Sequence, residues 1–142
     1  KKKIKMNYKI VSKYIKDLSF KIPGAKKYFL LEKNIKNYRI KIDVTSKKIN
    51  ESVVEIDTNL YFDPKKEGSD DFKISLLFSS IINCEKKIDD KELEKIVLID
   101  VPTTVYPDIK KIISSLFEKS GFKEFNLPEM DFKKFYEDKR KN

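Results

Sequence analysis

The sequence predicts an α+β fold in which a four-stranded antiparallel sheet is followed by a long helix and a short C-terminal helix. Two patterns predict this order. Four segments in the first part of the chain have apolar residues at alternate positions, whereas later segments have apolar residues three and four positions apart. With 142 residues and 39% hydrophobic content, the chain is large and apolar enough to bury one core. We therefore expect a single domain over residues 1–142, with a ragged basic N-terminus at 1–7.

The candidate strands are residues 8–22, 38–44, 53–62 and 72–78. In the first of them the even positions are apolar except Ser12 and Lys16, which predicts that Tyr14 and Leu18 share one face. In all four segments the other face is polar. A sheet with one polar face is typically covered by helices on one side only, and this is the arrangement that we expect.

The links between the candidate strands differ in length. Residues 47–52 and 63–71 are short and polar, which favours antiparallel neighbours in the sheet. The link at 23–37 is longer and begins with a Pro-Gly pair. Because it contains four consecutive apolar residues at 28–31, we expect a loop that packs on or covers another part of the protein.

Helical spacing begins after the fourth candidate strand. Asp89 or Asp90 is placed to cap a helix through KELEKIVLID, and Pro102 is expected to end or kink that helix. After Pro107 an apolar stripe predicts a longer helix, with Gly121 just after its last turn. The members of this stripe are Ile109, Ile112, Ile113, Leu116 and Phe117.

The C-terminal part is rich in aromatic residues. After the irregular segment FKEFNLPEM, Asp131 is placed to cap a short helix with Phe132, Phe135 and Tyr136 on one side. Aromatic residues at helical spacing usually belong to a core, but those in an irregular segment can also line a binding surface. A sheet covered on one side and flanked by an aromatic segment would form an apolar groove for extended peptides. The pattern therefore predicts a binding or assembly module.

The residue inventory argues against an enzyme. The chain has no histidine and only one cysteine, Cys84, so it lacks the commonest general base and the residues of a usual zinc site. It also lacks the glycine-rich motifs of nucleotide-binding loops and the G-x-S-x-G motif of hydrolases. The paired carboxylates at 70–71 and 89–90 lie in a turn and at a helix start, where capping explains them. We therefore expect no catalytic residue, no metal and no cofactor.

The net charge of +9 at pH 7 raises the alternative of a nucleic-acid-binding protein. Against it, only Arg39 and Arg140 are arginines among 32 basic residues, and arginine is favoured for bidentate contacts with bases and phosphates. The lysines are also spread along polar positions rather than clustered. With one cysteine and no apolar run of membrane-spanning length, we expect a cytoplasmic protein.

Three segments resemble the SecB family of bacterial export chaperones. The first, YIKDLSFKIPGA, is similar to the family's first strand, Y-x-K-D-[IL]-S-F-E-x-P-x-A. The second, VPTTVYPDIKKIISSLFEKSGF, resembles the family's long helix with its two prolines five residues apart. The third, FNLPEMDFKKFY, resembles the segment before the family's last helix. Their order and spacing also match, so the resemblance covers residues 14–136.

The resemblance implies a SecB-like fold, a homotetramer built as a dimer of dimers, and ATP-independent binding of unfolded precursor chains in apolar grooves. The residues that it places in the client-binding groove are Tyr38, Ile40, Ile42, Phe122, Phe125, Leu127, Phe132 and Phe135. The residues that it places at subunit contacts are Phe72, Ile74, Leu76 and Phe78. For each of these residues, burial in the core of a single chain is the alternative.

The resemblance also implies docking of the basic tail of the SecA motor on an acidic sheet surface. Asp17 matches one of the docking acids, but Lys21 stands where the family has an acid. Lys73 and Ser75 align with the family's exposed Leu and Glu. A basic tail would therefore meet repulsion, and the sequence supports the chaperone function more than the SecA partnership. SecB-like chaperones that protect antitoxins need no acidic face, so antitoxin control is the first alternative.

Two further alternatives belong to other classes of protein. A lysine-rich nucleic-acid binder would show tight, steeply salt-dependent binding to DNA or RNA. A small-lipid carrier would need a closed apolar cavity inside one subunit, whereas the chaperone needs an open groove.

Overall fold

The computed structural model describes residues 7–64, 72–85, 87–122 and 125–141. The strands β1 (Tyr8–Lys21), β2 (Tyr38–Lys48), β3 (Val53–Pro64) and β4 (Lys73–Cys84) form one antiparallel sheet in the order β1-β4-β3-β2. Helix α1 (Ala25–Asn34) and the 3-10 helix η1 (Ile35–Asn37) connect β1 to β2. After the sheet come α2 (Asp90–Lys95), the π-helix η2 (Ile96–Asp100), α3 (Val101–Lys119) and α4 (Phe132–Lys141). This is the predicted α+β order; almost all of the expected ragged N-terminus lies outside the described residues.

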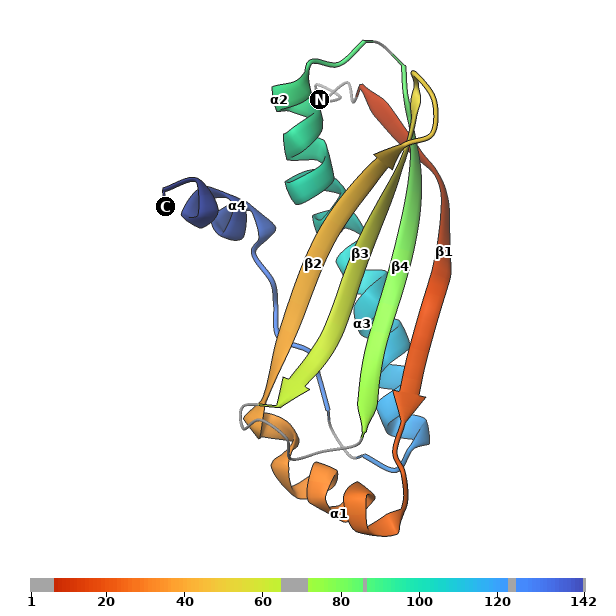
Figure 1. Cartoon of the computed structure of the whole chain (residues 1–142), viewed down its shortest axis with the longest axis vertical. Helices are drawn as coiled ribbons and strands as arrows, with labels where there is room; N and C mark the ends of the chain where they lie inside the picture. The colour runs from red at the N-terminus through yellow and green to blue at the C-terminus, as the bar shows by residue number, and fades with distance from the viewer. Residues whose placement is uncertain (1–6, 65–71, 86, 123–124, 142) are drawn as a thin grey trace, which may run out of the picture.

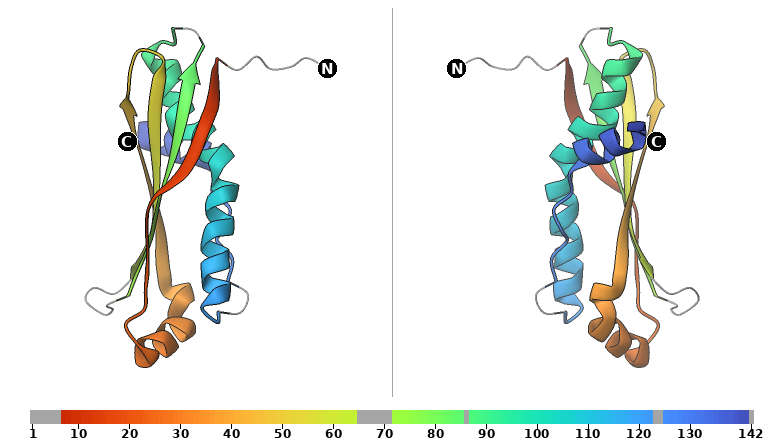
Figure 2. Two further views of the ribbon diagram at one scale, coloured as in Figure 1. Left: turned by 90° about the vertical axis from the view of Figure 1, so that its right-hand side faces the viewer. Right: turned by 90° about the vertical axis from the view of Figure 1, so that its left-hand side faces the viewer.

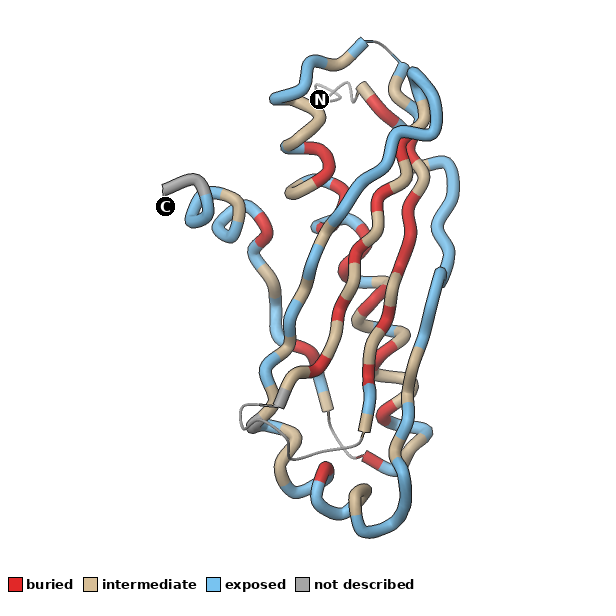
Figure 3. The backbone as a smooth tube through the Cα atoms, in the orientation of Figure 1, coloured by how far each residue is buried: buried red, intermediate tan, exposed pale blue. Residues whose placement is uncertain are grey.

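The sheet has a covered face and an open face. Helix α3 lies along the covered face, and no described helix lies on the other, as Figures 1 and 2 show. Burial is concentrated on the central strands β3 and β4 and on the side of α3 that meets them (Figure 3). The fully buried residues of this layer include Ile56, Leu60, Ile74, Leu76, Ile82, Val105, Ile109, Ile113 and Phe117. Burial of each such side chain stabilises the fold by about 1.5–3 kcal/mol, so this layer is the core.

Two β-bulges in β1 change which of its residues face α3. The pairing of β1 with β4 shifts register at two points, and Val11 and Lys16 have no partner residue. Each bulge reverses the alternation of faces in the residues that follow it. The prediction that Tyr14 and Leu18 share a face is therefore wrong, because the bulge at Lys16 lies between them. Tyr14 lies on the open face, while Leu18, opposite Leu76, lies on the covered face.

The helical part begins where the sequence predicts. Asp89 caps α2, since its carboxylate accepts a hydrogen bond from the backbone N–H of Glu92 at 2.7 Å. The helix does not end at Pro102, because α2, η2 and α3 follow one another without a break, but the π-helical turn η2 interrupts the regular α-helix directly before this proline. Just before this proline the N–H of Val101 donates to the carbonyl of Ile96, a π-helical bond. This wider turn changes the hydrogen-bond register where the helix meets a residue that has no N–H to donate.

The link between β1 and β2 is helical and closes one end of the fold (Figure 1). Leu31 of α1 is buried, and the ring of Tyr28 lies 5.2 Å from the ring of Phe122. The prediction that this link packs on the protein is confirmed, although as a helix rather than a loop. Gly121 follows α3 with φ of 86°, the left-handed conformation expected of a glycine after the last helical turn.

Candidate functional site

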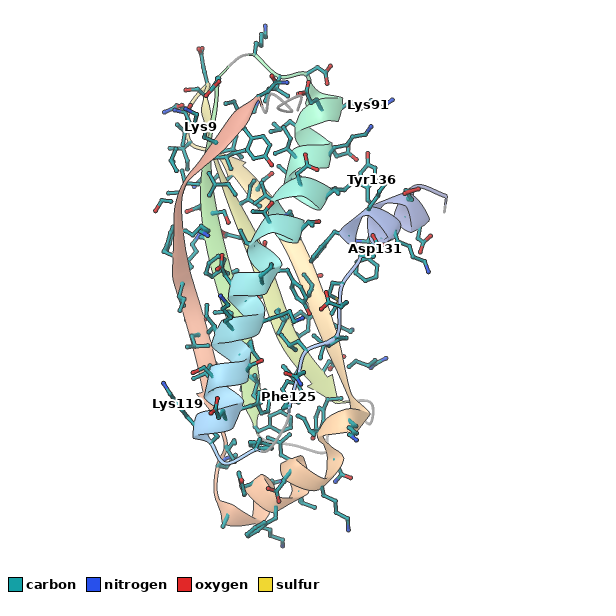
Figure 4. All side chains as sticks on the ribbon, turned by 180° about the vertical axis from the view of Figure 1, so that it is seen from behind. Lys9, Lys91, Lys119, Phe125, Asp131 and Tyr136 are labelled. Atoms are coloured by element: carbon teal, nitrogen blue, oxygen red, sulfur yellow. The ribbon has the colours of Figure 1, made fainter. Side chains whose placement is uncertain are left out.

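An apolar groove lies between the edge strand β2 and helix α4. It encloses about 830 Å³ and opens to solvent. Its apolar lining consists of Ile40, Ile42, Val44, Leu98, Met130, Phe132, Phe135 and Tyr136. Its polar lining consists of Asp43, Thr45, Glu94, Asp138 and Lys139. Figure 4, which shows the covered face of the sheet, labels Tyr136 on α4, beside the strand edge.

The β2 wall of the groove follows from the alternation of the strand. Ile40, Ile42 and Val44 are half-buried, whereas Arg39 before them and Lys41 between them are exposed on the open face. Among the described strands, β2 pairs only with β3, so its other edge is free. The three apolar side chains therefore remain accessible beside an unpaired strand edge.

The α4 wall is held in place by α3. Asp131 caps α4 by accepting a backbone hydrogen bond from its first turn at 3.0 Å, as the sequence predicts. Phe132 is buried with its ring 5.9 Å from that of Tyr106, while Phe135 is 48% exposed. The hydroxyl of Tyr106 donates to the carbonyl of Pro128 at 2.6 Å. Burial raises the pKa of Tyr106 to about 12, so this hydroxyl keeps its proton and ties the segment before α4 to α3.

The structure divides the predicted client-binding residues into two groups. Those that lie together in the groove are Ile40, Ile42, Phe132 and Phe135. Those that do not line it are Tyr38, Phe122, Phe125 and Leu127. Phe122 and Phe125 pack around the buried Phe117, with ring centroids 5.0 and 4.1 Å from it. Leu127 is 3% exposed, and Tyr38 is half-buried. Packing within the chain explains this second group: the irregular segment folds back along α3, and the ring of Tyr38 on β2 packs against that of Phe72.

Four apolar lining residues were not among the predicted ones: Val44, Leu98, Met130 and Tyr136. Val44 belongs to the same period-two set as Ile40 and Ile42, and Tyr136 shares the helix side of Phe132, so both carried a sequence signal. Leu98 carried no such signal, because only the packing of η2 beside β2 and α4 brings it to the groove.

Three of the four predicted subunit-contact residues lie on β4, and Phe72 directly precedes it. Ile74, Leu76 and Phe78 are 1%, 0% and 5% exposed beneath α3, and β4 is hydrogen-bonded on both edges by β1 and β3. Side chains without exposed surface add no contact area to another subunit, so these three belong to the core of this chain. Phe72 is half-buried, and its ring lies 4.7 Å from that of Tyr38. Large hydrophobic side chains that stay exposed on the neighbouring strand β1 are Val11, Tyr14, Ile15 and Leu18.

The part of the chain that the structure describes was searched for metal-binding groups and for a reactive cysteine. No group of three or more His, Cys, Asp or Glu side chains within it could hold a metal ion. Cys84 is half-buried at the end of β4, and burial raises the pKa of its thiol, which disfavours the reactive thiolate. Among the described helices, none combines the length and the apolarity that a membrane crossing requires.

The family model described as preprotein translocase subunit SecB matches residues 1–142. The chain belongs to the SecB family. A putative protein-export protein SecB of Pelagibacter ubique is 33% identical over 132 residues, which are 92% of this chain and 94% of that protein. The protein-export protein SecB of Rhodospirillum rubrum is 26% identical over 127 residues, which are 89% of this chain and 78% of that protein.

Solved structures show the same fold at low sequence identity. A Mycobacterium tuberculosis SecB-like chaperone, in complex with an antitoxin peptide, has a TM-score of 0.59 at 12% identity and covers 87% of this chain and 91% of that one. A Streptococcus agalactiae protein of unknown function has a TM-score of 0.52 at 13% identity, with coverages of 89% and 99%. This chain is therefore a SecB family chaperone with the SecB-like fold.

The open face of this SecB family chain carries the four residues predicted for motor docking. Lys21 at the end of β1 lies directly opposite Lys73 at the start of β4, and both are exposed. Ser75 and Asp17 lie in the next two rows of the same face. Like charges directly opposite each other on neighbouring strands repel, and this end of the open face presents two adjacent lysines.

Farther along the open face, two carboxylates are held by neighbouring side chains. The ammonium of Lys16 lies 2.9 Å from Asp57 and 3.1 Å from Glu55. The hydroxyl of Tyr14 donates to Glu55 at 2.5 Å, and the hydroxyl of Ser79 donates to Asp57. These hydrogen bonds, first that of Tyr14 and then that of Lys16, hold the pKa of Glu55 below its ordinary value. Both carboxylates therefore have partners within the chain.

Proposed function

We propose that this SecB family chaperone is an ATP-independent holdase that binds non-native polypeptide segments in the groove between β2 and α4. The observation that carries the proposal is the lining of the groove, where apolar side chains on a free strand edge face aromatic side chains on α4. Apolar burial contributes about 25 cal/mol per Å² and does not depend on a particular sequence. Such a groove would select extended apolar segments, which native proteins bury.

We further propose that the chain is one domain and works in the cytoplasm as a homotetramer, a dimer of dimers. Supporting this, the edge strand β1 leaves Val11, Ile15 and Leu18 57%, 47% and 38% exposed. Several exposed apolar side chains on one edge strand are typical of a surface that another subunit covers. The proposed contact therefore involves β1 rather than the buried side chains of β4.

The SecA motor is a candidate partner, but a basic tail would not dock well on the open face of the sheet. Lys21 and Lys73 would repel it, while Glu55 and Asp57 are held by Lys16. Delivery to the motor would then require another contact surface.

A dedicated antitoxin client is the second candidate function. The observation that favours it is the likeness in fold to the Mycobacterium tuberculosis SecB-like chaperone in complex with an antitoxin peptide. Antitoxin control would use the same groove and differ from export only in the client, so one assay with two clients compares the two functions.

Suppression of aggregation tests the proposed function. A denatured client that scatters light on dilution should remain in solution when this protein is added at a stoichiometric ratio. The double variant Ile42→Ser/Phe135→Ser should lose most of this effect, because both side chains line the groove. Ile49→Ser is the matched control, since Ile49 is 55% exposed in the turn after β2 and does not line the groove. No suppression by the unmodified protein would contradict the proposal; tight salt-dependent DNA binding in its place would favour the nucleic-acid alternative.

A further inference from the structure

Helix α1 lies at one end of the molecule (Figures 1 and 2). It presents two large apolar side chains to solvent. Phe29 is 64% exposed and Leu30 is 43% exposed. The opposite side of the helix is anchored, because Leu31 is 1% exposed and the ring of Tyr28 packs against Phe122. The anchoring fixes the rotation of α1 about its axis, so Phe29 and Leu30 cannot turn inward without breaking the core contacts.

Two lysines flank this apolar pair on the same side of the helix. Lys26 precedes Phe29 by three positions and Leu30 by four, and Lys33 follows them by four and three, which are the spacings of neighbours on a helix surface. Both lysines are exposed. The one acid of α1, Glu32, accepts a hydrogen bond from the hydroxyl of Tyr28 at 3.4 Å. The outward face of α1 is therefore apolar at its centre and cationic at its borders.

Other described lysines lie around this end of the molecule, together with one exposed acid of α3, Glu118. Lys36 is exposed in η1, Lys21 ends β1 just before α1, and Lys119 ends α3 at the same end of the molecule (Figure 4). Salt at physiological concentration screens charges beyond about 8 Å, so lysines close to the same surface are the ones that act on it together.

We propose that the outward face of α1, formed by Lys26, Phe29, Leu30 and Lys33, binds an anionic lipid surface. Lipid headgroups carry negative charge for the lysines, and the acyl boundary below them accepts Phe29 and Leu30 without any preformed cavity. A second copy of the chain would bring the lysines of both copies together, and the charges would repel. A stable protein interface needs about 800 Å² from each partner, far more than two adjacent side chains on a convex end supply.

Such a contact would be weak, reversible and sensitive to salt. Two apolar side chains with a few lysines resemble a single lipid anchor, which gives only marginal membrane binding. The helix would lie in the plane of the interface rather than cross the membrane, in keeping with the lack of a membrane-spanning helix among the described residues. The proposal is independent of client binding, because no residue of α1 lines the groove.

Co-sedimentation with vesicles tests this proposal on the full-length chain. Vesicles of equal parts phosphatidylcholine and phosphatidylglycerol should bind the protein at low salt, and pure phosphatidylcholine vesicles should not. Phe29→Ser/Leu30→Ser and Lys26→Gln/Lys33→Gln should each weaken binding about tenfold or more. The matched controls at the other end of the molecule are Ile49→Ser, which removes a side chain that is 55% exposed, and Lys47→Gln/Lys48→Gln, which removes two exposed charges.

The outcomes separate a local site from general attraction of a +9 protein to anionic vesicles. Weaker binding of the α1 variants to anionic vesicles, with little change in the binding of the controls, supports the proposal. Three results overturn it. The α1 lysine variant and the control lysine variant lose the same amount of vesicle binding, or the unmodified protein binds neutral and anionic vesicles equally, or it does not bind anionic vesicles. The groove variant Ile42→Ser/Phe135→Ser should bind vesicles normally, so failure of the chaperone assay and failure of the lipid assay are distinguishable. Circular dichroism checks that each variant is folded.

Discussion

The ammonium of Lys13 on β1 lies 2.9 Å from a carboxylate oxygen of Asp108 on α3. This ion pair connects the edge strand to the helix that covers the sheet. Lys13 reaches α3 because the bulge at Val11 turns it toward the covered face. With 43% and 38% of their side-chain surfaces exposed, the two charges are screened by solvent.

Replacing Asp108 by asparagine is therefore expected to lower the free energy of unfolding by less than about 1 kcal/mol. Its neighbour Ile109 is fully buried against the sheet, so Ile109→Ala should lower it by about 2–5 kcal/mol through lost burial and a cavity. Urea denaturation at one protein concentration measures both variants. A larger loss for Asp108→Asn than for Ile109→Ala would contradict this description of α3.

The stability of the protein should fall at acid pH partly through Glu55. The hydrogen bonds from Tyr14 and Lys16 lower the pKa of Glu55 below the ordinary value of 4.5. Its stabilising contribution is therefore complete above that value and is lost as the pH falls through the lowered pKa. Glu55→Gln should make the unfolding free energy less dependent on pH in this range, and Tyr14→Phe should do so to a smaller degree. Denaturation curves collected between neutral and acid pH check this; unchanged pH dependence in Glu55→Gln would refute it.

Two glycines should respond differently to the same substitution. Gly121 has φ of 86°, and a Cβ there would lie 2.7 Å from the hydroxyl of Tyr28, so Gly121→Ala should destabilise the protein by about 1–2 kcal/mol. Gly24 has an extended backbone and no atom within 4 Å of the added Cβ, so Gly24→Ala should be neutral or slightly stabilising. Thermal unfolding of the two variants side by side gives the comparison. Equal effects would mean that the conformation of Gly121 is not as described.

The paired lysines on the open face should weaken the binding of any basic ligand there. Lys21→Glu/Lys73→Glu is expected to raise the affinity for a basic peptide at least about threefold at low salt, and the gain should shrink as salt is added. Lys9→Glu/Lys47→Glu makes the same charge change at the other end of this face and serves as the control. Fluorescence anisotropy with a labelled lysine-rich peptide measures both. If the control gains as much as the test variant, net charge rather than the Lys21–Lys73 pair decides the affinity.

Features that depend on a few neighbouring residues could be predicted from the sequence. The caps at Asp89 and Asp131 and the glycine at 121 are decided by local hydrogen bonds and backbone conformation. The α+β order likewise follows from short-range periodicity. The faces of β1 could not be predicted, because its bulges exist only in the pairing with β4, although Lys16 already interrupted the apolar pattern at one of them.

The candidate site was predictable only in part, for the same physical reason. Ile40 and Ile42 lie on a regular strand, and Phe132 lies on a capped helix. The period of each element therefore predicted which side of that element these residues occupy. Phe122 and Phe125 belong to an irregular segment, and their burial depends on the aromatic ring of Phe117 at the end of α3. Local sequence does not encode that contact, so the sequence could not tell whether these two residues line the groove or belong to the core.

The central claim is that clients bind between β2 and α4, and crosslinking tests it most directly. A photo-crosslinking residue at position 135, where Phe135 is 48% exposed in the groove, should crosslink to an unfolded client with high yield. The same residue at position 49, where Ile49 is 55% exposed outside the groove, should give little or no product. An excess of a second, unlabelled unfolded protein should compete with the reaction at 135. Equal yields at the two positions, or none at 135 while aggregation is still suppressed, would contradict the placement of the client site in this groove.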